Sequence, residues 1–127
     1  MTRKGKKAKK ILIVDDENSL RMLVHATLEG EDYIILQAKN GHEAVILNEM
    51  EKPDLVILDL MMPGLSGMEA LEIMRKSETS RNIPIIILTA KGQAADKEKA
   101  LRMGASHFLK KPFSPLELLT FVEKILN

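Results

Sequence analysis

Three short aliphatic runs, each ending directly in polar residues, constrain the fold of this chain more than any other feature. The runs and the residues that end them are Ile11–Val14 before Asp15 and Asp16, Leu55–Leu58 before Asp59, and Ile85–Leu88 before Thr89. Uninterrupted Val, Ile and Leu runs of this length are typical of strands in a parallel sheet that is covered on both faces. The sequence therefore predicts buried strands whose carboxyl ends carry acids or a hydroxyl group.

Segments with helical periodicity alternate with these strands and divide the chain into five strand–helix units. We expect strands over about 10–15, 33–38, 55–59, 85–89 and 106–110, and helices over about 18–29, 41–51, 66–76, 93–103 and 115–127. Strands that alternate with helices of about 10–15 residues imply βαβ units with right-handed crossovers. The predicted fold class is α/β, with a doubly wound parallel sheet of five strands.

Local signals mark where several helices begin. Ser66 with Glu69, and Ser114 with Glu117, have the spacing of capping boxes, and Pro115 suits the first helical position. The first helix is expected to end at a glycine and to bury one apolar face. That glycine is Gly30, and the face carries Leu20, Leu23, Val24 and Leu28.

The polar residues at the strand ends are expected to meet at one edge of the sheet. In a doubly wound sheet of order 2-1-3-4-5, the first and third strands are neighbours, and ligands bind at the switch point between them. Three carboxylates there repel one another, and a hard divalent cation such as Mg²⁺ together with one lysine balances their charge. The groups brought together are Asp15, Asp16, Asp59, Thr89 and either Lys110 or Lys111.

Each of these residues, taken singly, also has an ordinary structural explanation. Asp15 or Asp16 could begin the helix that follows, since acids suit helix N-termini. Asp59 could be a solvated strand end, Thr89 a plain strand-end residue and Lys111 a surface lysine. Their joint occurrence at the ends of predicted neighbouring strands favours a functional site.

With these motifs in this order, the chain resembles the receiver domains of bacterial two-component response regulators. The matching residues are Val14-Asp15-Asp16, Leu58-Asp59 with Met62-Pro63-Gly64, Leu88-Thr89-Ala90, Gly104-Ala105, Phe108 and Lys111-Pro112-Phe113. Each motif alone is common, whereas their order and intervals together are specific. The resemblance is to single-domain, chemotaxis-regulator-like members over about residues 10–127, and it implies the flavodoxin-like (βα)5 fold with strand order 2-1-3-4-5.

The resemblance also implies a role for each site residue. Asp59 is the expected phosphoacceptor, which takes a phosphoryl group from a sensor histidine kinase or a phosphotransfer protein. Asp16, Asp59 and the backbone carbonyl of Met61 are expected to coordinate Mg²⁺, with Asp15 helping through water or from behind the direct ligands. Lys111, preferred over its neighbour because it precedes a proline, is expected to pair with the phosphoryl group.

Two further residues are expected to form a switch. After phosphorylation, the Thr89 hydroxyl moves onto a phosphoryl oxygen and the ring of Phe108, which alone could be a core aromatic, turns inward. The surface of the fourth helix, fifth strand and fifth helix then binds an unknown downstream protein. A cis peptide bond before Pro112 and a monomer or weak dimer are also expected.

Other classes of phosphate-binding and phosphoryl-transfer protein lack their signatures here. The chain has no G-x-x-x-x-G-K-[ST] loop and no G-x-G-x-x-G after the first strand, where Asp15-Asp16-Glu17-Asn18 would repel a bare phosphate or flavin phosphate. A phosphatase of the dehalogenase type needs a second acid two residues after its nucleophile, and that position is Met61. We therefore expect a protein that is itself phosphorylated rather than an enzyme with an external substrate. The alternative is a receiver-shaped interaction module that is not phosphorylated.

The charge is divided unevenly along the chain. Residues 1–10 hold six basic residues and no acid, which leaves 13 basic against 18 acidic residues in the rest. We expect residues 1–9 to be a disordered, solubilising tail, although a nucleic-acid or membrane-surface arm is the alternative. No cysteine is present, which suits a reducing cytoplasm. No membrane span, secretory signal or DNA-binding domain is expected in this chain.

Overall fold

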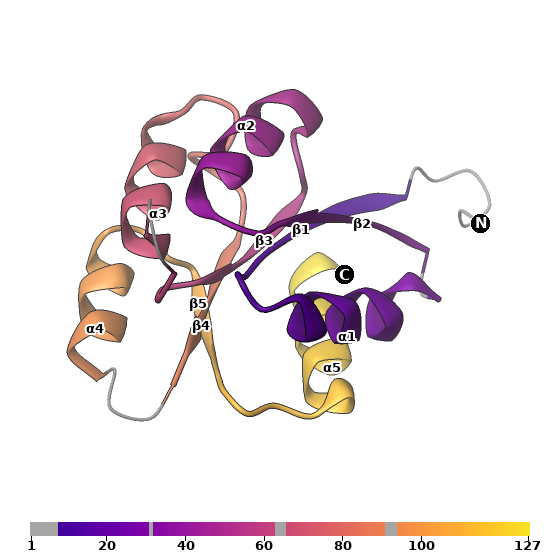
Figure 1. The fold of residues 1–127 in the computed structure, drawn as a ribbon. Coiled ribbons are helices and arrows are strands. Elements are labelled where there is room, and N and C mark those ends of the chain that lie inside the picture. The colour runs from indigo at the N-terminus through magenta and orange to yellow at the C-terminus, as the bar shows by residue number, and fades with distance from the viewer. Residues whose placement is uncertain (1–7, 31, 63–65, 91–93) are drawn as a thin grey trace.

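The computed structural model contains a five-stranded parallel sheet with helices on both faces (Figure 1). It describes residues 8–30, 32–62, 66–90 and 94–127. The strands lie in the order β2-β1-β3-β4-β5, which confirms the predicted doubly wound, flavodoxin-like topology. The elements are β1 (Lys9–Val14), α1 (Asn18–Glu29), β2 (Tyr33–Ala38), α2 (Gly41–Glu51), β3 (Leu55–Asp59), α3 (Gly67–Lys76), β4 (Ile85–Thr89), α4 (Ala94–Arg102), β5 (His107–Lys110) and α5 (Pro115–Leu126).

The sheet divides the interior into two apolar cores, because successive side chains of a strand point to opposite faces. Leu12 and Val14 of β1 pack on the side of α2, α3 and α4, whereas Ile11 and Ile13 pack on the side of α1 and α5. Figure 1 shows the same division of the helices between the two faces. All residues of β3 and β4 are buried, as the aliphatic runs predicted for strands covered on both faces.

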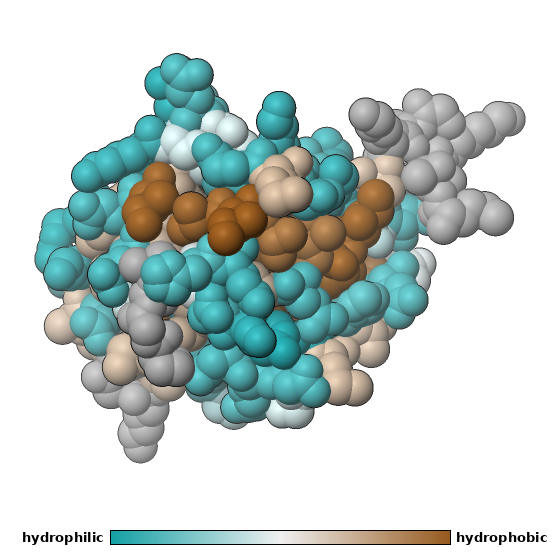
Figure 2. All heavy atoms as spheres, turned by 45° about the horizontal axis from the view of Figure 1, so that its top comes forward, coloured by the Kyte–Doolittle hydropathy of each residue, from teal (hydrophilic) through white to brown (hydrophobic). Residues whose placement is uncertain are grey.

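Hydrophobic side chains also gather in a band over the α2 side of the surface, as Figure 2 shows. Two large residues of α2, Ile46 and Met50, are exposed. The buried positions of this helix are instead its small or polar ones, Gly41, Ala44 and Asn48. Consequently α2 approaches the core through small and polar residues, while Ile46 and Met50 face outward.

The predicted helix starts are confirmed by side-chain caps. Ser66 and Ser114 each accept a hydrogen bond from the backbone three residues on, and Glu69 and Glu117 each accept one from the capping residue. Asn40 caps α2 in the same way through its side-chain oxygen. These local bonds explain why the starts of the helices could be predicted within a residue or two.

Several predicted details differ from the structure. Gly30 ends α1, but with φ of −74°, so the freedom of glycine to adopt a left-handed conformation is not used. Leu23, expected on the buried face of α1, is 40% exposed. The strand β1 begins at Lys9, one residue inside the predicted tail, and ends before Asp15. The strand β5 begins one residue later than predicted. Residues 1–7 of the predicted tail lie outside the described part of the chain.

Arg75, the penultimate residue of α3, links the connections at the amino end of the sheet. Its guanidinium donates hydrogen bonds to the carbonyls of Ser80 (2.7 Å), Ile83 (2.8 Å) and Gly104 (2.7 Å), and to the hydroxyl of Ser106 (3.1 Å). These acceptors belong to the α3–β4 connection and to the turn that precedes β5. One side chain therefore holds two loops that are distant in sequence.

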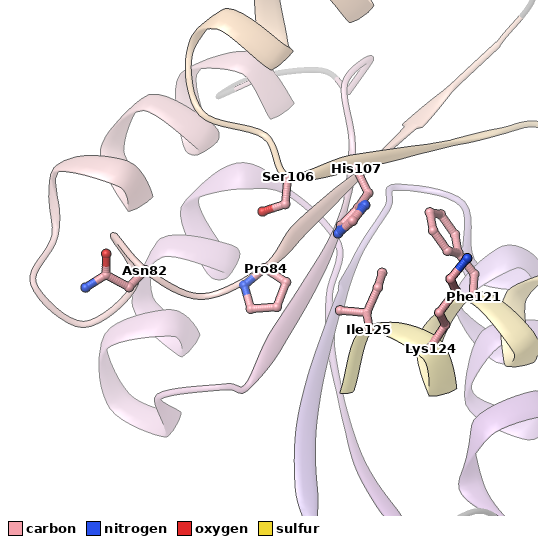
Figure 3. A pocket seen from close by; sticks show the side chains of 7 residues that line it. All are labelled: Asn82, Pro84, Ser106, His107, Phe121, Lys124 and Ile125. Atoms are coloured by element: carbon pink, nitrogen blue, oxygen red, sulfur yellow. The ribbon is translucent and has the colours of Figure 1, made fainter. Parts of the chain in front are cut away.

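A pocket of about 580 Å³ lies beside these connections (Figure 3). The rings of His107 and Phe121 meet edge to face there, with centroids 5.6 Å apart. His25 is also half-buried and His42 is exposed, so all three histidines lie at the surface or the core edge, as predicted. The residues that line the pocket are Asn82, Pro84, Ser106, His107, Phe121, Lys124 and Ile125.

Among the helices formed by the described residues, none is both long enough and apolar enough to cross a membrane.

Candidate functional site

The three predicted acids come together at the carboxyl end of the sheet. In the β1–β3 ladder, Val14 pairs with Leu58, so the residues that follow them, Asp15 and Asp59, emerge side by side. One carboxylate oxygen from each of Asp15, Asp16 and Asp59 lies within 4.8 Å of the others. The strand order thus brings together the three acids that follow the aliphatic runs, as the sequence predicted.

Asp15 is buried, and both of its carboxylate oxygens have partners. Oδ1 accepts a hydrogen bond from the backbone N–H of Glu17 (2.9 Å), and Oδ2 accepts one from Nζ of Lys111 (3.0 Å). Asp15 and Asp16 precede the N-cap of α1, which is Glu17. The bond from Lys111 to Asp15 shows that this acid also has a partner far from the helix. Asp16 is exposed and makes no hydrogen bond with the described residues. Asp16 therefore has free oxygens for a cation.

Asp59, the last residue of β3, is 5% exposed. Its Oδ1 accepts a hydrogen bond from the backbone N–H of Met61 (3.3 Å), and Lys111 Nζ lies 3.6 Å from its Oδ2. Burial and the charge of Asp15 raise the pKa of Asp59 to about 6, although Lys111 and the Met61 N–H act in the opposite direction. The site therefore holds more negative charge than its own lysine neutralises.

Lys111 is the lysine that enters the site, as the resemblance implied, while Lys110 is exposed. Burial alone would lower the pKa of Lys111, but the hydrogen bond to Asp15 and the charges of Asp59 and Asp15 outweigh it, so the pKa is raised. The backbone N–H of Lys111 donates a hydrogen bond to the carbonyl of Thr89 (2.6 Å). The peptide bond between Lys111 and Pro112 is cis, as predicted. This backbone anchor directs the ammonium toward the two buried carboxylates.

The two predicted switch residues lie on neighbouring strands. Thr89 is the buried last residue of β4 and pairs with Lys110 of β5. Phe108 lies two positions earlier on β5, opposite Ile87, with 40% of its surface exposed. Phe108 is therefore partly exposed beside β4, and its role in a switch stays a prediction.

Gly67 is a site residue that the sequence interpretation missed. Its backbone N–H bonds the Leu60 carbonyl (3.2 Å), and an added Cβ would lie 1.9 Å from the carbonyl oxygen of Asp59. The start of α3 therefore touches the end of β3, and only glycine permits this approach. A glycine at the first helical position, directly after the capping serine, was the available signal.

The cluster fits a hard divalent cation by its chemistry. Its donors are carboxylate oxygens, the atoms that Mg²⁺ prefers, and three acids face a single lysine. Met61 is exposed at the edge of the site, and the following residues 63–65 lie outside the described part of the chain. The residues present can therefore hold a metal ion at the ends of β1 and β3.

Comparison with known proteins gives a consistent family. A family model described as the response regulator receiver domain matches residues 11–123. The chain is 42% identical over 119 residues to the phosphate regulon transcriptional regulatory protein PhoB of Pseudomonas aeruginosa, and 43% identical over 119 residues to the alkaline phosphatase synthesis transcriptional regulatory protein PhoP of Bacillus subtilis. These alignments cover 94% of this chain but 52% and 49% of those proteins, so the chain spans about half the length of the curated relatives it matches.

Solved structures agree with the sequence relatives. The chemotaxis protein CheY4 of Vibrio cholerae superposes with a TM-score of 0.86 and 32% identity, over 92% of this chain and 98% of that one. A putative response regulator of Chloroflexus aurantiacus gives 0.87 and 33%, over 94% and 98%. The range matched by the family model, residues 11–123, includes the strand ends that carry the acids. The chain therefore belongs to the response regulator receiver domain family of two-component signalling proteins.

Proposed function

We propose that this domain accepts a phosphoryl group on Asp59 and thereby switches its binding to a protein partner. A carboxylate oxygen of Asp59 attacks the phosphorus of a phosphohistidine, the N–P bond breaks, and the imidazole leaves with the bonding electrons. The observation that carries the proposal is the approach of Lys111 Nζ to Asp15 (3.0 Å) and Asp59 (3.6 Å). The ammonium group of Lys111 thus lies beside the buried carboxylate of Asp59, although the two residues are far apart in sequence. In this position it can bind the negative charge of a phosphoryl group on Asp59.

The neighbouring residues have distinct roles in this reaction. Asp16, Asp59 and the backbone carbonyl of Met61 would hold Mg²⁺, and Asp15, whose oxygens already have partners, would act through water or through Lys111. When bound, the ion would offset the negative charge of the carboxylates and of the phosphoryl group. Lys111 then pairs with the phosphoryl oxygens. The domain promotes only its own phosphorylation and dephosphorylation and is not an enzyme with an external substrate.

The switch transmits phosphorylation to the face formed by α4, β5 and α5. The Thr89 hydroxyl moves onto a phosphoryl oxygen, and the Phe108 ring turns into the space that this movement opens. A hollow of about 440 Å³ lies between β5 and α5, and Leu116 at its rim is exposed, which suits a surface that binds protein. A downstream protein binds this face more tightly when Asp59 is phosphorylated.

The partners follow from this chemistry. The phosphoryl donor is a sensor histidine kinase or a phosphotransfer protein, and the output partner is a protein that recognises the α4–β5–α5 face. A cytoplasmic location, a monomeric or weakly dimeric state and the role of the basic tail stay predictions.

The test is intact-protein mass after incubation with acetyl phosphate, with and without Mg²⁺. The wild type is compared with Asp59→Asn and with Asp96→Asn, a matched loss of an exposed acid on α4. We expect one phosphoryl group on the wild type and on Asp96→Asn, only with Mg²⁺, and none on Asp59→Asn. No phosphorylation of the wild type by acetyl phosphate or by any phosphohistidine donor would favour the interaction module instead.

A further inference from the structure

The ammonium group of one lysine on α4 lies over the ring of Phe108. Lys97 Nζ is 3.5 Å from the ring centroid, well inside the range of a cation–π contact. We propose that Lys97 is a positioning residue that holds Phe108 in its outward position and so limits switching before phosphorylation. This inference rests on the proposed function, because it assigns a regulatory contact to the same switch.

No competing partner for the Lys97 ammonium group lies near it among the described residues, so the Phe108 ring is its main contact. Its neighbours one turn away on the helix are Ala94, Ala100 and Leu101, none of which can pair with an ammonium group. Glu98 lies within ion-pair distance of Arg102 (3.9 Å) rather than of Lys97. Among the described residues, Lys97 has no carboxylate within ion-pair distance.

The outward ring position needs a compensating contact. Phe108 leaves 40% of its surface in water, although Ile87, its neighbour on β4, is fully buried. Turning the ring inward would bury more apolar surface on the α4 side of the sheet, which is favourable. The cation–π contact acts against this movement, because it is made only while the ring stays outward beneath Lys97.

Replacing the cation should therefore raise the inward population of the unphosphorylated protein. Cation–π contacts at exposed sites change an equilibrium by about two- to fivefold. Lys97→Met keeps the length of the side chain and removes the charge, whereas Lys97→Arg keeps a cation that can stack on the ring. Lys99→Met removes an exposed lysine of the same helix that contacts no aromatic ring in the part of the chain that the structure describes.

The experiment is ¹⁹F NMR of protein labelled with 4-fluorophenylalanine. The chain has three phenylalanines, so Phe108 gives one of three signals and is assigned with Phe108→Leu. We expect Lys97→Met to move the Phe108 signal in the direction produced by acetyl phosphate with Mg²⁺ in the wild type, while Phe113 and Phe121 stay in place. Lys97→Arg and Lys99→Met should leave the Phe108 signal at its wild-type position.

The outcomes separate this inference from the proposed function. A Phe108 signal unchanged in Lys97→Met, or moved equally by Lys99→Met, would overturn the role of Lys97 even if phosphorylation moves the wild-type signal. If phosphorylation of the wild type leaves the Phe108 signal in place, the proposed switch is wrong and the regulatory role falls with it. In that case, ring-current shifts of the Lys97 methylene protons that vanish in Phe108→Leu would still identify a purely structural contact.

Discussion

Asp59 lies where its environment opposes its negative charge. Burial and the neighbouring carboxylate of Asp15 raise its pKa, and Lys111 offsets only part of their effect. A carboxylate that is costly to ionise in the folded state gains from a bound cation. The residue that the proposed reaction needs is thus also a source of instability in the metal-free protein.

The first prediction concerns the pH dependence of stability without metal. The unfolded Asp59 ionises near 3.8 and the folded one near 6, so the folded state holds more protons between these values. The free energy of unfolding therefore falls as the pH rises from about 4 to about 6, and the loss is complete above that window. Asp59→Asn should match the wild type near pH 4 and be about 2–3 kcal/mol more stable at pH 8. Urea unfolding in EDTA at both pH values measures this, and a difference that does not change with pH would contradict it.

The second prediction concerns the close approach at Gly67. Gly67→Ala places a methyl group against the backbone of Asp59, so we expect a loss of about 3 kcal/mol or more and a distorted acceptor loop. Gly30→Ala is the control, because no atom lies within 4 Å of the added carbon and φ is −74°. That control should gain about 0.4–1 kcal/mol. Thermal unfolding measures the change in stability of both variants. Equal changes in Gly67→Ala and Gly30→Ala would disprove the steric explanation.

Some site residues could be predicted from sequence because they end recognisable strands. Asp15, Asp16 and Asp59 were found from the aliphatic runs before them, since register alone brings their positions together. The choice of Lys111 over Lys110 came only from the resemblance, because nothing local distinguishes two adjacent lysines. Lys97 gave no signal at all, since its contact with Phe108 depends on how α4 sits over β5.

At the scale of elements, the helices were predicted well because their ends are fixed locally. Capping serines and glutamates three residues apart mark α3 and α5 in the sequence itself. Connections held by distant groups could not be predicted in this way. Arg75 binds carbonyls 5, 8 and 29 residues away, and no short-range pattern indicates such partners.

The third prediction tests this link between elements. Arg75→Met should cost about 2 kcal/mol or more, because partly buried carbonyls of the α3–β4 connection and of Gly104 lose their donor. Arg102→Met is the matched control, since Arg102 is exposed and, within the described parts of the chain, pairs with Glu98 alone at 3.9 Å. It should change the free energy of unfolding by less than about 0.5 kcal/mol. Urea unfolding measures the free energy of unfolding of both variants. Similar losses would show that the hydrogen bonds of Arg75 do not stabilise the two connections.

For the whole molecule, the proposed binding of Mg²⁺ would couple to folding through the acid cluster. The fourth prediction is that Mg²⁺ at about 100 times its Kd stabilises the wild type by about 2.7 kcal/mol, which raises Tm by roughly 10 °C for a domain of this size. Asp16→Asn removes the exposed acid of the cluster and should reduce this increase. Calorimetry with Mg²⁺ and with EDTA measures it, with Asp96→Asn as the control that keeps the full increase.

The sheet separates two apolar cores, and substitutions in the two cores are expected to have different consequences. The core beneath α2, α3 and α4 lies on the side of Phe108 and Lys97, where the proposed switch must move. The core beneath α1 and α5 contains Leu109, Leu118 and Val122 and is closed off by the strands. Substitutions in the first core should therefore alter the proposed movement of Phe108, whereas substitutions in the second should act mainly on the stability of the fold. A change in signalling and a change in stability are thus expected from opposite faces of the same sheet.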